Sequence, residues 1–131
     1  MTLTIITPDA VVYDGKANFF VGRAIDGEFG VLPNHAPMII ALDVAPLRID
    51  DPEGKKQTFA VFGGFVEIEN NKVSIITPNC ENPEAIDIER AERAKERAEG
   101  RLSNPTPDID VERAEHALAR ALLRLKVTKR I

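Results

Sequence analysis

The sequence of 131 residues lacks several features that would assign it to a secreted or membrane-spanning class. Its single cysteine, Cys80, excludes a disulfide within the chain, which fits a reducing compartment such as the cytosol. No apolar run approaches the roughly 20 residues that a membrane-spanning helix needs. Residues 1–8 do not combine a basic segment with an apolar one, so we expect no secretory signal.

The sequence also has few of the residues that form catalytic or metal centres. Its two histidines, His35 and His116, have no cluster of cysteine and histidine around them that would bind zinc. We expect a structural role for His35, which lies in a proline-flanked turn, and a solvated helix position for His116. Cys80 has no histidine nearby in the sequence to activate it. We therefore predict a protein that has no catalytic residues and no metal ligands.

Charge is distributed unevenly within the net charge of −4. Residues 86–131 have a balance of +2, whereas residues 1–85 have a balance of −6. The acidic first part argues against nucleic acid as a partner. The arginine-rich second part suits an acidic protein surface or a phosphate group. The alternative is a solvated helix surface on which each arginine pairs with a neighbouring glutamate.

The first two thirds of the sequence predict short β-strands separated by tight turns. The runs are rich in Val, Ile, Phe and Thr, and turn residues lie between them at Asp14-Gly15, Asp26-Gly27, Pro52-Glu53-Gly54 and Asn70-Asn71. Gly63 and Gly64 are not followed by the residues of a phosphate-binding loop, so we expect a bulge or close packing there. This pattern predicts an antiparallel sandwich or barrel. The expected strands span residues 2–7, 17–23, 38–42, 47–50, 57–62, 65–69 and 72–77.

The last third of the sequence predicts an antiparallel pair of helices. After Pro83 the composition shifts to the strong helix formers Ala, Glu, Arg and Leu. The first helix is expected from Asp87, its N-cap, to near residues 100–102, where two prolines in residues 103–107 interrupt it. The second is expected from Asp108 or Asp110 to about Val127. We accordingly expect two domains, residues 1–84 and 85–131.

Three segments of the sequence have the character of family motifs. Gly27–Pro37 reads GEFGVLPNHAP, Phe62–Ile68 reads FGGFVEI and is followed by Asn71–Val73, and Ile86–Ala91 reads IDIERA. These segments resemble motifs of the epsilon subunit of bacterial F-type ATP synthases. Their order and spacing agree with the family, and the resemblance covers essentially the whole chain.

This resemblance implies a fold and a place in a larger machine. The fold would be a flattened N-terminal β-sandwich of about ten strands, followed by a C-terminal antiparallel two-helix hairpin. The sandwich would bind the gamma subunit and the ring of c subunits, and so help to couple ion translocation to ATP synthesis. The hairpin would either fold back or extend toward the alpha/beta catalytic head, and the extended form would inhibit ATP hydrolysis. Such a subunit is not an enzyme, does not insert into the membrane, and lies peripherally at its cytoplasmic face in bacteria.

The resemblance also implies a regulatory ATP site in the hairpin. Guanidinium groups suit phosphate oxygens, because they are permanently charged and offer paired donors. Two carboxylates, Asp87 and Glu81, could accept from an adenine amino group or a ribose hydroxyl. No cofactor is required beyond this ligand, and the sequence leaves open whether Mg²⁺ accompanies it. The candidate ATP-binding residues are Glu81, Ile86, Asp87, Arg90, Ala91, Arg97, Arg113, Arg120 and Arg124.

Two other interpretations stay open at the level of sequence. Asp87 could act only as a helix N-cap, with the arginines paired to glutamates of the same helix. The protein would then be a purely structural coupling subunit that binds no nucleotide. A small independent enzyme is a further class, but it would require a catalytic set of residues that we do not find.

Overall fold

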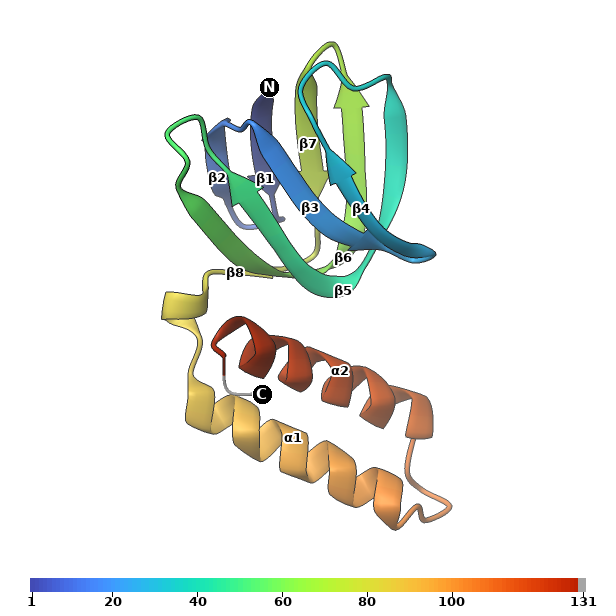
Figure 1. Cartoon of the computed structure of the whole chain (residues 1–131). Coiled ribbons are helices and arrows are strands. Elements are labelled where there is room, and N and C mark those ends of the chain that lie inside the picture. Colours follow the sequence, from blue (N-terminus) through green and yellow to red (C-terminus); the bar gives the residue numbers. More distant parts are fainter. Residues whose placement is uncertain (130–131) are drawn as a thin grey trace. The chain divides into compact units, whose positions relative to one another are not determined.

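The computed structural model describes residues 1–129, and the chain divides into two compact units, of which the first spans Met1–Asn82 and the second begins at Pro83 (Figure 1). Strands alternate with turns in the first unit, as the β-rich sequence predicts, although two of the strands are long. Its strands are β1 (Thr2–Ile6), β2 (Val11–Lys16), β3 (Phe19–Ala24), β4 (Gly27–Val31), β5 (Met38–Asp50), β6 (Lys56–Glu69), β7 (Lys72–Ile76) and β8 (Cys80–Glu81).

The strands form one continuous sheet in the order β2-β1-β7-β6-β5-β3-β4, with β8 paired to β6. All neighbours are antiparallel except β1 and β7, which run parallel. This sheet folds over into the two layers of a sandwich, and the long strands β5 and β6 belong to both layers. One end of β6 pairs with β7, and the other end pairs with β8. The predicted sandwich followed by a helix pair is confirmed.

Both long strands are interrupted at the same level. Gly63 and Gly64 of β6 have φ values of 83° and 105°, and the paired register between β5 and β6 skips Asp43 there. Two positions of positive φ turn the strand direction without steric cost for glycine. This bend explains why we expected two strands in each of the segments 38–50 and 56–69, whereas the structure has one. It also accounts for eight continuous strands where about ten were implied.

The core of the first unit lies between the two layers and is mainly aliphatic, with Phe20 and Phe59 also buried in it. In β1, β3 and β7 alternate residues are buried, and in β1 Leu3 and Ile5 are fully inaccessible. Phe20 and Phe29 meet edge to face within this region, with ring centroids 5.9 Å apart. Other side chains of the buried cluster are Leu47, Ile49, Val61, Val66, Ile68, Val73, Ile75 and Cys80.

The turn predictions were right at three places and wrong at one. Asp26-Gly27 joins β3 to β4, with Asp26 in the turn. Asn70 and Asn71 both adopt left-handed φ values, 52° and 60°, and join β6 to β7 as a tight hairpin. Gly54 has φ 83° between β5 and β6. Asp14-Gly15, however, lies inside β2, where Gly15 pairs with Leu3 of β1. The predicted turn there is wrong because pairing to β1 holds both residues extended.

The second unit contains a short 3₁₀ helix, Pro83–Ala85, and the helices α1 (Ile88–Ser103) and α2 (Val111–Val127). The predicted helix pair is confirmed, including its N-caps: the side chains of Asp87 and Asp110 accept from the backbone N–H of Arg90 and Arg113, each at 3.0 Å. The buried residues of α1 are both alanines, and two of those of α2 are Ala114 and Ala121. Small side chains let the two helix backbones pack closely.

Candidate functional site

An exposed row of apolar side chains crosses four strands of the first unit. Ile6 of β1 pairs with Ile76 of β7, Ile76 with Phe65 of β6, and Phe65 with Ala41 of β5. Directly paired residues point to the same face of a sheet. The backbone N–H of Ile25 donates to the carbonyl of Ala41 at 3.2 Å and so extends the row to the β3–β4 turn. We call these five residues the apolar row.

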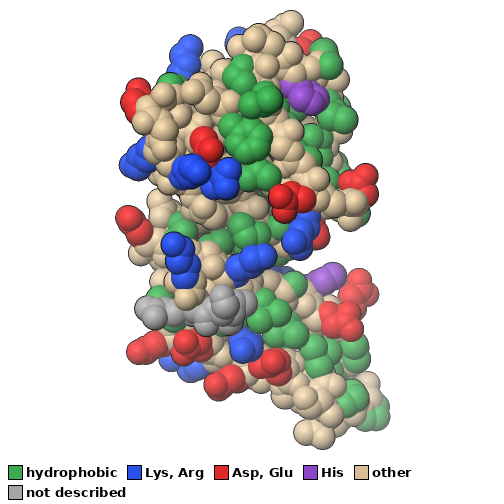
Figure 2. Space-filling view, viewed as in Figure 1, with side chains coloured by type: hydrophobic (Ala, Val, Ile, Leu, Met, Phe, Trp, Pro, Cys, Tyr) green, Lys and Arg blue, Asp and Glu red, His purple; other side chains and the backbone are tan. Residues whose placement is uncertain are grey.

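Much of the apolar row is in contact with solvent. The exposed fraction is 74% for Ile25, 57% for Phe65 and 52% for Ile76. Ile39, two residues before Ala41 on β5, is 72% exposed and adds to the same face. Figure 2 shows hydrophobic side chains gathered on the strand unit. Contiguous exposed apolar surface of this kind marks a protein–protein contact more often than isolated apolar residues do.

The motif Gly27–Pro37 forms strand β4 and the loop that follows it. In the loop, Asn34 adopts a left-handed φ of 64°, and the side chain of the partly buried His35 lies with Nδ1 2.7 Å from the carbonyl oxygen of Ala36. Leu32 is an exposed apolar residue at the start of this loop. The local contact of His35 agrees with the structural role expected for it.

Arginines recur along one side of the helix pair. Arg90, Arg97 and Arg101 follow i, i+7 and i+11 spacing, which places them on one face of α1. Arg113, Arg120 and Arg124 follow the same spacing on α2. Arg101 and Arg113 line a common hollow of about 310 Å³, so both rows lie on the same side of the hairpin. We call this the arginine side.

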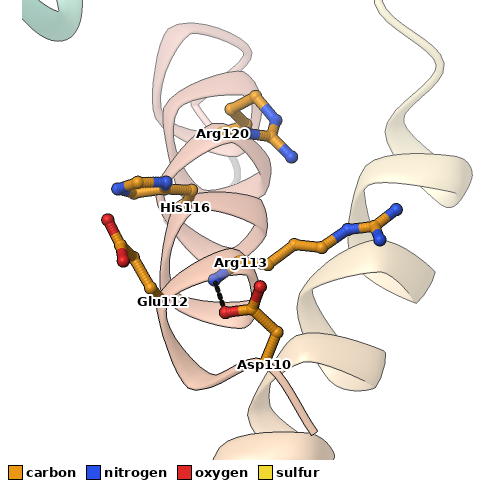
Figure 3. A pocket seen from close by; sticks show the side chains of 5 residues that line it. All are labelled: Asp110, Glu112, Arg113, His116 and Arg120. Carbon is orange, nitrogen blue, oxygen red and sulfur yellow. Dashed lines mark hydrogen bonds between the residues drawn. The ribbon is translucent and has the colours of Figure 1, made fainter.

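A second hollow, of about 250 Å³, lies along α2 (Figure 3). Asp110, Glu112, Arg113, His116 and Arg120 line it. The side chains of Arg113 and Arg120 point to one side of the helix, and those of Glu112 and His116 to the other. Its volume lies below the roughly 300–1,000 Å³ typical of small-molecule pockets. A hollow of this size suits a phosphate group better than a whole nucleotide.

The ion pair of α1 involves none of the arginines named above. Arg93, which lies three residues after Arg90 and four before Arg97 and so borders the arginine side, is 4.0 Å from Glu89. Within residues 1–129, the guanidinium groups of Arg90, Arg97, Arg101, Arg113 and Arg120 form no ion pair. These cations are therefore available to an anion from outside the chain.

The other candidate ATP-binding residues have different surroundings. Ile86 is partly buried, Asp87 is exposed, and Ala91 is buried in the helix pair, where it provides space and not a polar contact. Glu81 belongs to β8 of the first unit, where its Oε2 accepts a 2.9 Å hydrogen bond from the side chain of Asn79. Arg101 was not among our predicted residues, although its i+4 spacing from Arg97 could have indicated it.

Cys80 lies in the buried cluster and pairs with Val61 of β6. Burial, and to a lesser degree the nearby charge of Glu81, raises the pKa of the thiol to about 12. A neutral thiol at physiological pH is a poor nucleophile.

None of the helices within residues 1–129 combines the length and the apolar character needed to cross a membrane.

Comparison with known proteins assigns both units. Residues 1–83 match the β-sandwich domain of the ATP synthase delta/epsilon chain, and residues 84–129 match its long α-helix domain. The chain belongs to the ATP synthase delta/epsilon family. It is 46% identical over 129 residues to the ATP synthase epsilon chain of Brevibacillus brevis, with 98% of each chain covered. It is 43% identical to that of Desulforamulus reducens, with 97% of this chain and 96% of the relative covered.

Chains from two solved ATP synthase assemblies share the fold. A chain of the Euglena gracilis mitochondrial ATP synthase, solved as the OSCP/F1/c-ring assembly, aligns with a TM-score of 0.84 at 26% identity. The alignment covers 97% of this chain and 79% of that one. A chain from the central stalk and c-ring of the Tetrahymena thermophila mitochondrial enzyme aligns with a TM-score of 0.64 at 14% identity, which shows a shared fold. The resemblance predicted from the three sequence motifs is confirmed.

Proposed function

We propose that this chain is the epsilon-type subunit of the central stalk of an F-type ATP synthase, where it helps to couple ion translocation to ATP synthesis. The observation that carries this proposal is the match of both units, over nearly the whole chain, to the delta/epsilon family. The structures that it resembles come from assemblies that contain the c-ring. The subunit performs no chemistry and sits peripherally at the cytoplasmic face of the membrane.

The strand unit is the docking part of this subunit. Its apolar row, with Phe65 near the centre, would pack against the gamma subunit, and the Leu32–Pro37 loop would approach the c-subunit ring. Covering Ile25, Phe65 and Ile76 removes apolar surface from water, which favours association by about 25 cal/mol for each Å² buried. This assignment explains why these apolar residues are exposed, since they make no contribution to the core of the isolated chain.

The helix pair is the regulatory part, and ATP is its ligand. The arginine side would hold the phosphates through Arg90, Arg97, Arg113 and Arg120, supported by Arg124. Asp87 would accept from the adenine amino group or the ribose hydroxyls, while Ile86 and Ala91 would shape the apolar part of the site. Within residues 1–129, the guanidinium groups of Arg90, Arg97, Arg113 and Arg120 form no ion pair, and this supports the assignment because a triphosphate would supply negative charge to them.

Regulation would follow from a shift between two states of the hairpin. ATP that binds only the folded hairpin favours that state, by no more than its difference in affinity for the two states. When ATP is scarce, the extended hairpin would reach the alpha/beta catalytic head and inhibit hydrolysis. Deletion of residues 87–131 should therefore leave assembly intact and raise ATP hydrolysis by the reconstituted complex. Unchanged hydrolysis would show that the hairpin does not inhibit.

Calorimetric titration of ATP into the full chain tests the ligand assignment, with and without Mg²⁺. Arg90→Ala should abolish the binding heat, whereas Lys126→Ala, which removes an exposed cation on the opposite face of α2 from Arg113, should preserve it. Asp87→Asn is the sharper variant, since an amide oxygen still caps the helix but the second oxygen becomes a donor. Loss of binding with unchanged helix content would identify Asp87 as a ligand residue.

A purely structural coupling subunit is the second candidate. The observation in its favour is that Asp87 and Asp110 cap their helices in nearly identical ways, with φ and ψ of −80° and 103° against −82° and 100°. Asp87 thus needs no ligand to explain its place. If titration with millimolar ATP gives no heat, this candidate replaces the regulatory one.

A further inference from the structure

We propose that the apolar row is surrounded by acidic side chains that select a partner surface with a basic rim and accelerate its docking. The inference rests on the proposed function, because it describes the chemistry of the surface that docks in the stalk. It adds the charge of the partner and a rate effect that apolar contact alone does not produce. We call Asp14, Asp26, Asp43 and Glu67 the acidic rim.

The strand register places the acidic rim on both sides of the apolar row. Glu67 lies two residues after Phe65 on β6, and pairs with Ser74 of β7 and Ile39 of β5. Asp14 pairs with Thr4, which lies two residues before Ile6 on β1. These two carboxylates therefore flank the row along one side.

The other side of the row ends in carboxylates as well. Asp43 lies two residues after Ala41 on β5, and its Oδ1 accepts a 2.8 Å hydrogen bond from the backbone N–H of Val44. Asp26 follows Ile25 at the β3–β4 turn. All four rim residues are exposed, so their charges act on whatever approaches the row.

Basic residues lie farther out or face an acid. Lys16 and Lys72 are both in register with Thr2, one row beyond Thr4 and Ser74, and Lys72 pairs with Glu69. Arg23, two residues before Ile25, pairs with Glu28 across β3 and β4. The immediate border of the apolar row is therefore negative.

A negative border has a definite kinetic consequence. Charges at the rim of an interface mainly change the association rate and its salt dependence, whereas the buried centre sets the dissociation rate. A partner whose contact surface carries Lys or Arg around an apolar centre would be attracted, and an anionic lipid surface would be repelled. We therefore assign the row to a protein partner with a basic rim, and not to the membrane.

Association kinetics of the full chain with the catalytic core that contains gamma, prepared without its own epsilon chain, test this inference. From about 50 to about 500 mM NaCl, the wild-type association rate should fall about tenfold, because rim charges become screened. The triple variant Asp26→Asn, Asp43→Asn, Glu67→Gln should associate slowly even at low salt and show little salt dependence. Its dissociation rate should change by less than about twofold.

A matched triple variant separates this effect from net charge. Glu92→Gln, Glu96→Gln and Glu99→Gln remove the same charge from α1 and should leave the association rate at the wild-type value. The inference is overturned if the rim variant associates as fast as the wild type at every salt concentration, or if the wild type binds vesicles of anionic lipid more tightly than the core complex. If Phe65→Asp still binds the core, the docking surface itself is wrong. If Phe65→Asp abolishes binding while the rim variant behaves as wild type, only the inference about charge fails.

Discussion

The backbone N–H of Asn34 donates a 2.8 Å hydrogen bond to Oδ1 of Asn71, which lies 37 residues later in the chain. This bond ties the loop after β4 to the hairpin between β6 and β7, and so joins the two motifs of the strand unit. Asn34 and Asn71 both have left-handed φ values, 64° and 60°, which asparagine tolerates better than most residues. The side chain of Asn71, which lies in the β6–β7 hairpin, thus also holds the loop after β4 in place.

Replacing Asn71 should reveal this bond in the stability of the chain. Asn71→Gly keeps the left-handed conformation but removes the acceptor, and should lower the free energy of unfolding by about 1 kcal/mol. Asn71→Asp keeps an acceptor oxygen and should retain most of the stability. Urea denaturation of both variants measures the difference. Equal losses in the two variants would show that the bond to Asn34 contributes nothing.

Gly64 should be the least replaceable glycine of the strand unit. A Cβ atom there would overlap the carbonyl oxygen of Ile76 and lie 2.8 Å from Cα of Thr77, at a φ of 105°. Gly54 also has a positive φ, 83°, but a Cβ there would meet nothing within 4 Å. We expect Gly54→Ala to cost about 1 kcal/mol from backbone strain alone. Gly64→Ala should lower the free energy of unfolding by at least about 2 kcal/mol, because the backbone of Ile76 and Thr77 must also move.

Denaturation of the two glycine variants under identical conditions separates strain from collision. A cost for Gly64→Ala no larger than that for Gly54→Ala would contradict the close approach of β6 to the end of β7 at Ile76 and Thr77. Because Gly64 also bends β6 between the two layers, its variant should lose strand signal in circular dichroism before the helices melt.

Cys80 should make the stability of the chain depend on alkaline pH. Burial raises the pKa of its thiol from 9.0 to about 12 in the folded chain. Above pH 9 the unfolded chain releases a proton that the folded chain retains, so the stabilising contribution present below pH 9 is lost as pH rises toward 12. The free energy of unfolding should therefore decline in this window, by at most about 1.4 kcal/mol per pH unit from this group.

Cys80→Ala is the control for that dependence. It should flatten the decline, although the pKa of Tyr13 is also raised, mainly by burial, and contributes a slope of the same sign at higher pH. An unchanged slope between pH 9 and 10 in Cys80→Ala would show that the thiol is not protected as the structure indicates.

Sequence patterns predicted the elements that depend on local preferences, and missed those that depend on distant pairing. Helices α1 and α2 were found because their N-caps and alanine spacing are local signals. Strand β2 was missed because Asp14-Gly15 by itself favours a turn, whereas pairing with β1 holds both residues extended in the folded chain. Strand β4 was missed because its glycines suggest a loop, although Gly30 allows Phe19 to pack over the strand.

The same division holds for the candidate sites. The arginines of the hairpin could be predicted from their spacing, and the same spacing could have indicated Arg101. Only the packing of the two helices shows that Arg113 of α2 lies beside Arg101. The apolar row could not be predicted, because its members come from four strands and a turn whose register is set by the whole sheet. A surface that spans several strands depends on their register, which patterns within a single segment of sequence do not determine.

Proton pumping driven by ATP in membranes that have lost their epsilon chain tests the central claim most directly. Added wild-type chain should restore pumping, and so should Val111→Asp, which alters an exposed apolar residue of α2. Phe65→Asp, in the centre of the apolar row, should fail to restore it while keeping the wild-type circular dichroism spectrum. Full restoration by Phe65→Asp would contradict the assignment of the apolar row as the surface by which this subunit docks in the stalk.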